Sequence, residues 1–242
     1  MAVHYRTKGF IFKEENRGDA DKIFSVFTYD YGRIDVVGKA IRKIASKLRG
    51  GMEIYSLSEI EFIQGKAFKT LTDAQILEKF PGIKTDVKKY DIARCISFVL
   101  DALLKGEEAD IKTWELLGKA FREINAYDDE MIYYFYLWKL FSALGYEPDV
   151  FNCVKCGSQL KPGKLFFSYR DSAVLCSSCI FPGQKNCTEV DADMIKILRL
   201  IFSWDWNAFS KIKIENSSKD VFKNFSEDYQ RFFLSSFTFQ NI

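Results

Sequence analysis

The sequence of 242 residues predicts an α+β protein of several domains, in which a small N-terminal β-barrel precedes an α-helical domain with an inserted cysteine-rich module. Short β-type runs fill residues 1–72, and helical spacing of apolar residues dominates residues 73–242. Residues 151–189 hold five of the six cysteines. We therefore predict a barrel domain at 1–72 and a helical domain at 73–242, with the module at 151–189.

The first 72 residues contain five short segments rich in Phe, Ile and Val. They are GFIFK, KIFSVFTYD, YGRIDVV, MEIYSLSEIEFIQ and KAFKTL. A hairpin is expected at Tyr31-Gly32 and a turn at Gly65. Five strands in about 70 residues are typical of a small barrel, and the OB-fold is the leading candidate.

Helical spacing is expected from Thr72-Asp73 onwards, since these two residues would cap a first helix. Apolar stripes at helical spacing then follow over Tyr90–Leu104 and Trp114–Ile124. The segment Asp128–Leu144 is apolar nearly all round, which predicts a buried central helix. Two more helices are expected after the module, over residues 191–201 and 219–237.

Four of the cysteines form two Cys-x-x-Cys pairs, Cys153 with Cys156 and Cys176 with Cys179, and nineteen residues lie between the pairs. This spacing is typical of a four-cysteine Zn²⁺ site, in which the thiolates surround the metal as a tetrahedron. Four protein ligands leave no position for water or substrate, so the zinc would be structural. Iron in the same tetrahedron and a redox dithiol are the alternatives. Cys187 has no partner in this pattern and is interpreted as a spare thiol.

No motif indicates an enzyme. The sequence has no Walker phosphate loop, no GxGxxG and no HExxH, and its only histidine, His4, lies near the N-terminus. The first residues have no signal-peptide pattern. The most apolar run, MIYYFYLWKLFSALG, contains Lys139 and is too short to cross a bilayer. We therefore expect a cytoplasmic protein without catalytic residues or membrane contact, in a compartment where disulfides are rare.

Positive charge is concentrated near the N-terminus of a chain whose formal net charge is only +2. Residues 1–72 carry 13 basic and nine acidic side chains, whereas residues 73–150 carry 10 and 15. The densest basic stretch is GKAIRKIASKLRGG, residues 38–51, which contains no acid. Its cations are Lys39, Arg42, Lys43, Lys47 and Arg49.

The basic stretch is expected between the third and fourth barrel strands. It would form either a short amphipathic helix, with Ile41, Ile44 and Leu48 on the apolar face, or an ordered loop. A run of charge is often only a solvated surface. The functional alternative is a surface that binds nucleic-acid phosphates without reading sequence, as OB barrels do when they pair a charged groove with aromatic stacking.

Several segments together resemble the RecO family of bacterial DNA-repair proteins, which are recombination mediators. The resemblance runs nearly end to end. It includes TKGFIFKEENRGDADKIFSVFTYDYGRIDVV with its basic continuation to LRGG, LWKLFSALGYEPDVFNCVKCG and FFSYRDSAVLCSSC. The sequence Leu-Gly-Tyr-x-Pro before the first Cys-x-x-Cys pair is its most specific feature.

The resemblance implies an N-terminal OB-fold and a helical domain that carries the zinc module. It places the five cations in the family's basic segment, at Lys39, Arg42, Lys43, Lys47 and Arg49. It also matches four cysteines to the family's zinc ligands, at Cys153, Cys156, Cys176 and Cys179.

The activity implied by the resemblance requires no catalysis. Such proteins bind single- and double-stranded DNA, anneal complementary strands, and contact RecR and the acidic C-terminal tail of the single-stranded DNA-binding protein. They thereby help RecA to load onto coated single strands, which implies a location at the nucleoid. The alternatives are a protein-interaction adaptor with incidental DNA affinity, suggested by the acidic residues 73–150, and a metal-dependent redox enzyme.

Overall fold

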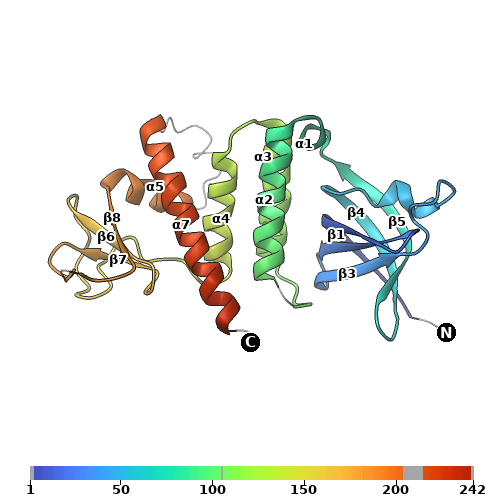
Figure 1. Cartoon of the computed structure of the whole chain (residues 1–242), viewed down its shortest axis with the longest axis horizontal. Helices are drawn as coiled ribbons and strands as arrows, with labels where there is room; N and C mark the ends of the chain where they lie inside the picture. Colours follow the sequence, from blue (N-terminus) through green and yellow to red (C-terminus); the bar gives the residue numbers. More distant parts are fainter. Residues whose placement is uncertain (1–2, 105, 182, 204–214, 241–242) are drawn as a thin grey trace. The chain divides into compact units, whose positions relative to one another are not determined.

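The chain folds into two compact units, Met1–Tyr133 and Tyr134–Ile242, in a computed structural model (Figure 1). The structure describes residues 3–104, 106–181, 183–203 and 215–240. Within these ranges, the first unit contains the N-terminal strands and three α-helices, and the second contains most of a fourth α-helix, two more α-helices and a small sheet. The boundary predicted at residue 72 lies inside the first unit, because strand β5 continues past it.

Five strands form an OB-type barrel at the start of the first unit, which confirms the predicted fold class. They are β1 (His4–Arg17), β2 (Asp21–Thr28), β3 (Gly32–Gly38), β4 (Ser56–Gln64) and β5 (Lys69–Lys79). The long strand β1 pairs with β2 along its second half and with β4 along its first half. The barrel closes through a short parallel pairing of β3 with β5, in which Val36 pairs with Lys69 and Val37 with Thr70.

The interior of the barrel is filled by alternate residues of its strands. Phe24 and Val26 of β2 are buried there with Ile34 and Val36 of β3, and Phe62 packs in the same cluster. Because successive side chains of a strand point to opposite faces, this spacing of two fixes the register of each strand. The predicted turns are also present, with a left-handed Gly32 at the start of β3 and a hydrogen bond from the Gly65 amide to the Phe68 carbonyl.

The helix predicted to begin at Thr72-Asp73 is wrong, because β5 runs through these residues to Lys79. Strand β4 pairs with β5 along this length, and Asp73 lies opposite Glu61. The Thr72 hydroxyl donates to the carbonyl of the same Glu61. Pairing with β4 therefore overrides the helical propensity of the sequence DAQILEK.

Helices α1 (Pro81–Thr85), α2 (Val87–Leu103) and α3 (Ile111–Ala126) complete the first unit. The side chains of Asp86 and Asp110 cap α2 and α3, because Asp86 accepts hydrogen bonds from two amides of the first turn and Asp110 accepts one. The ring of Phe10 in β1 packs tilted against Trp114 and edge-to-face against Phe121 of α3, with ring centroids 5.1 and 5.8 Å apart. The helical stripes predicted for α2 and α3 are therefore confirmed, and α3 packs against the barrel.

The second unit is built around α4 (Met131–Ala143), α5 (Ala192–Phe202) and α7 (Asn216–Gln240). The predicted burial of α4 is confirmed, since its apolar side chains are buried. Trp138 stacks on Tyr229 of α7 with centroids 4.9 Å apart and planes within 6°, and its indole N–H donates to Ser226. Within the described ranges, no helix is both long and apolar enough to cross a membrane.

Candidate nucleic-acid interface and metal centre

The basic segment, defined here as residues 38–51, connects β3 to β4, as the sequence predicts. Its only helical part is a short 3₁₀ helix, η1 (Lys47–Gly51), so the segment is an ordered connection and not an amphipathic helix. Ile44, predicted on the apolar face, is 94% exposed. Ile41 is buried in the barrel core, with Leu48 packed against it. Two of the three predicted apolar residues therefore pack on the barrel core, and the third faces solvent.

Backbone contacts hold the start of the basic segment against the turn between β1 and β2. The Arg42 amide donates to the Ala20 carbonyl at 3.0 Å, and the Ala40 amide donates to the Asp21 carboxylate at 2.7 Å. At the other end, Gly51 lies so close to Ala74 of β5 that an added Cβ atom would be 2.0 Å from its carbonyl oxygen. Both ends are therefore fixed to the barrel.

The cations of the basic segment all face solvent. They are Lys39, Arg42, Lys43, Lys47 and Arg49. Among the residues that the structure describes, none of the five forms an ion pair with an acid. Their charge is therefore uncompensated, which is what a surface for polyanions requires. Arg42 and Arg49 also line a hollow of about 220 Å³ together with Lys22.

The cysteine-rich module is a three-stranded antiparallel sheet with loops at its edge. Its strands are β6 (Leu165–Ser168), β7 (Ala173–Cys176) and β8 (Cys187–Val190), in the order β7-β6-β8. A tight turn carries the first cysteine pair, because the Gly157 amide donates to the Cys153 carbonyl at 2.8 Å and Gly157 is left-handed. The second pair begins at Cys176, the last residue of β7.

The four predicted metal ligands lie together, with all four Sγ atoms within 4.8 Å of one another. They are Cys153, Cys156, Cys176 and Cys179. The Sγ atoms of Cys156 and Cys176 are 3.9 Å apart. Zinc–sulfur bonds of about 2.3 Å in a tetrahedron require sulfur atoms roughly 3.8 Å apart. The cluster therefore fits a tetrahedral metal ion, and Cys187 lies outside it.

Hydrogen bonds within the cluster lower the pKa of Cys153 and raise the pKa of Cys179. Burial opposes the ionisation of Cys153, but the amides of Cys176, Cys156 and Lys155 outweigh it and lower the pKa of Cys153 to about 6. Neighbouring sulfurs of Cys156 and Cys176 raise the pKa of Cys179 to about 12. Four thiols this close cannot all lose protons without a cation between them, which is the electrostatic condition that a bound metal ion satisfies.

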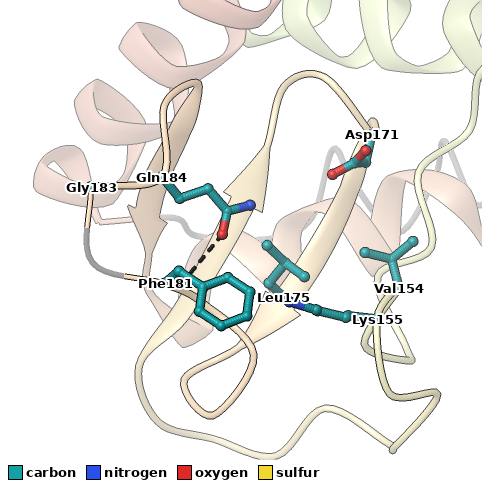
Figure 2. A pocket seen from close by; sticks show the side chains of 7 residues that line it. All are labelled: Val154, Lys155, Asp171, Leu175, Phe181, Gly183 and Gln184. Atoms are coloured by element: carbon teal, nitrogen blue, oxygen red, sulfur yellow. Dashed lines mark hydrogen bonds between the residues drawn. The ribbon is translucent and has the colours of Figure 1, made fainter.

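A hollow of about 560 Å³ beside the cysteine cluster was not predicted from the sequence (Figure 2). Val154 and Lys155, which lie between the first two cysteines, form one wall, and Phe181 forms another. The Lys155 ammonium lies 3.6 Å from the centroid of the Phe181 ring, and Gln184 accepts a hydrogen bond from the Phe181 amide. Val154 and Lys155 stand between two cysteines of the cluster, and this place in the sequence is the signal that could have indicated the hollow.

Two family models match the chain, and together they cover most of it. Residues 1–80 match the model described as recombination protein O N terminal, and residues 84–235 match recombination protein O C terminal. The division between the two models falls where β5 ends and α1 begins.

Curated relatives from several bacteria match along nearly their whole length, and each is named DNA repair protein RecO. The relative from Desulforamulus reducens is 24% identical over 230 residues, which is 95% of this chain and 90% of the relative. The one from Dehalococcoides mccartyi strain BAV1 is 26% identical over 211 residues, covering 87% of this chain and 83% of the relative. The one from Acetivibrio thermocellus is 25% identical over 231 residues, covering 94% and 91%. This protein, in which an OB-type barrel precedes a helical unit with a four-cysteine cluster, belongs to the RecO family of DNA-repair and recombination proteins.

Proposed function

We propose that this protein is a recombination mediator that binds single- and double-stranded DNA through its basic segment. In this role it anneals complementary strands and helps RecA to load onto single strands coated by their binding protein. Contacts with RecR and with the acidic C-terminal tail of the single-stranded DNA-binding protein belong to the same proposal, as does a location at the nucleoid. The mediator acts by bringing macromolecules together, so no residue is assigned a catalytic role.

The observation that carries the proposal is the set of five exposed cations without acidic partners among the described residues, on one connection of an OB-type barrel. Each phosphate contact made by a cation releases condensed counterions, which gives affinity without sequence preference. Such binding suits a protein that must act on any damaged sequence. Two complementary strands that are both partly neutralised repel each other less, which is how a basic surface promotes annealing.

We assign the cysteine cluster to a structural Zn²⁺. All four ligands come from the protein, and soft thiolates in a tetrahedron suit zinc. The ion would join the turn at Cys153 to the end of β7 at Cys176, so metal binding and folding of the module would be coupled. The basic segment belongs to the other compact unit, and the DNA contacts proposed for it require no metal ligand.

Equilibrium binding of the full chain to a labelled single strand and a duplex, at several salt concentrations, tests the proposal. Affinity should fall steeply with salt, and alanine at all five cationic positions should weaken binding to any sequence. For a single strand, each lost phosphate contact should reduce the slope of log K against log salt by about 0.7. Lys43→Ala and Lys112→Ala remove the same charge from the same unit, and only the first should change affinity and slope.

Two outcomes would redirect the proposal. Unchanged affinity in the five-alanine variant would mean that DNA contacts lie outside the basic segment. Capture of the acidic tail of the single-stranded DNA-binding protein, with no salt-dependent DNA binding and no annealing, would identify a protein-interaction adaptor instead.

A further inference from the structure

We infer that Phe68, in the turn between β4 and β5, is a stacking platform for an unpaired base, and that it extends the DNA surface beyond the basic segment. The inference rests on the proposed function and adds to it a residue that distinguishes single strands from duplex. It starts from the side-chain contacts that join three connections of the barrel.

Strand pairing places the three connections around strand β3. Arg17 at the end of β1 pairs with Asp21 at the start of β2, and Lys22 of β2 pairs with Gly38 at the end of β3. Strand β3 pairs in parallel with β5, beginning at Lys69, the first residue of β5. The β1–β2 turn and the start of the basic segment therefore lie at the end of β3, whereas the β4–β5 turn lies beside the middle of β3, because β3 and β5 are parallel. In OB-folds, the β1–β2 and β4–β5 turns commonly form two borders of the ligand-binding surface.

Side-chain contacts join these three connections directly. The guanidinium carbon of Arg17 lies 3.9 Å from the centroid of the Phe68 ring, so a cation covers one face of the ring. One residue further on, the Gly18 carbonyl accepts a hydrogen bond from the Arg42 guanidinium at 3.3 Å. A continuous path of basic and aromatic groups thus runs from Arg42 through the β1–β2 turn to Phe68.

The Phe68 ring keeps a large accessible surface despite the Arg17 contact. Its exposed fraction is 48%, and Gln64, Lys66 and Ala67 beside it are exposed as well. The ring therefore contributes little to the core, and its second face is open to a flat apolar partner. A nucleobase is such a partner, since every base has a π face and stacks on aromatic side chains irrespective of sequence.

A hollow next to Phe68 favours a base over a phosphate at this position. It has a volume of about 690 Å³ and is lined by Phe68, Gln64, Arg33 and Lys69. Both cations are already paired, Arg33 with Asp101 at 2.6 Å and Lys69 with Glu107 at 2.5 Å. Phosphates would therefore be held by the basic segment, and the aromatic ring with the amide of Gln64 offers what a base recognises.

Phe181 offers a matched control for Phe68. It is also an exposed phenylalanine beside a cation, Lys155, but it belongs to the cysteine-rich module in the other compact unit. The test measures binding of the full chain to a labelled oligo(dT) single strand and to a duplex of equal length, over a salt series. The variants are Phe68→Ala, Phe68→Leu, Phe68→Trp and Phe181→Ala.

Phe68→Ala and Phe68→Leu should each weaken oligo(dT) binding by about ten-fold, within the roughly 5- to 150-fold range of one lost base stack. Duplex affinity should change by less than about two-fold, because paired bases are not available for stacking. The salt slope should be unchanged, since no phosphate contact is lost. Phe68→Trp should keep or raise the affinity, and Phe181→Ala should behave like the wild-type chain.

The leucine variant preserves apolar bulk, so it separates loss of stacking from loss of folding. Wild-type affinity for oligo(dT) in Phe68→Ala would overturn this inference while leaving the proposed function intact. Equal losses on single strand and duplex would also overturn it, because stacking would then not be the cause. A wild-type chain that binds neither nucleic acid would refute the proposed function itself, and this inference with it.

Discussion

The backbone amide of Cys176 donates a hydrogen bond of 3.4 Å to the sulfur of Cys153, so the protein itself joins the two Cys-x-x-Cys pairs. Amide donors toward sulfur stabilise the thiolate, which is the form that binds metal. The end of strand β7 therefore positions the Cys176 sulfur and also favours the thiolate form of Cys153.

Cys176→Ser should lower the metal content and the melting temperature of the protein, because three remaining thiolates cannot complete the tetrahedron and the module folds with its metal. Cys187→Ser is the matched control, since Cys187 lies in the same module but outside the cluster. Elemental analysis of the purified variants and thermal melting provide the measurement. Full metal content with unchanged melting in Cys176→Ser would contradict a structural metal site.

Gly51→Ala should destabilise the first unit by about 1–3 kcal/mol, because the new methyl group would press on the backbone carbonyl of Ala74. Gly50→Ala changes the neighbouring residue, where an added Cβ atom meets nothing within 4 Å. That control should be neutral or slightly stabilising, since it restricts the unfolded chain. Urea denaturation of the two variants measures the difference, and equal stabilities would mean that the end of the basic segment is not fixed by this contact.

Ser226→Ala should cost about 1–3 kcal/mol, because it leaves the buried indole N–H of Trp138 without its acceptor. Ser235→Ala removes a hydroxyl from the same helix at an exposed position and should change stability by less than about 0.5 kcal/mol. Urea denaturation monitored by tryptophan fluorescence reports both. Equal effects of the two substitutions would show that the Trp138 hydrogen bond contributes little.

Lys139 should make stability rise with pH between about 8 and 10.5. Desolvation lowers its pKa from the usual 10.5 to about 8, with Glu147 opposing the shift. In that interval the unfolded chain still holds a proton that the folded chain has released, so folding becomes more favourable as pH rises. Below pH 8 both states are protonated and this contribution is constant.

The Lys139→Met variant isolates this effect from other titrating groups, because they are common to both proteins. Its free energy of unfolding, relative to the wild-type chain, should be higher at pH 7.5 than at pH 9.5. Urea titrations at the two pH values measure this difference. A difference that does not depend on pH would mean that Lys139 ionises normally in the folded chain.

Periodicity and cysteine spacing were sufficient to predict most of the fold and the cysteine cluster. The barrel strands were recognisable because their apolar residues must alternate to reach one interior. The cysteine cluster was recognisable because a Cys-x-x-Cys turn directs both sulfurs to one point. The second half of β5 was missed, because Ala, Gln, Leu, Glu and Lys favour helices and only the pairing partner β4 makes the segment a strand.

The shape of the basic segment and the position of Phe68 depend on contacts that no local pattern reveals. Ile44 has helical spacing from Ile41 but nothing to pack against, so the amphipathic helix does not form. Arg17 and Phe68 are far apart in the sequence and meet only because the barrel closes. Residues brought together by closure of a barrel can be found only when the strand order is known.

The narrow closure of the barrel has a consequence for its dynamics. Only two residue pairs join β3 to β5, at Val36–Lys69 and Val37–Thr70, so this seam should exchange its amide hydrogens sooner than the other strand pairs do. The basic segment begins at the end of β3, on one side of the seam, and Phe68 directly precedes β5, on the other side. A single strand of DNA that contacts both the basic segment and Phe68 would hold β3 and β5 together. Slower amide exchange at the seam would then report that DNA is bound.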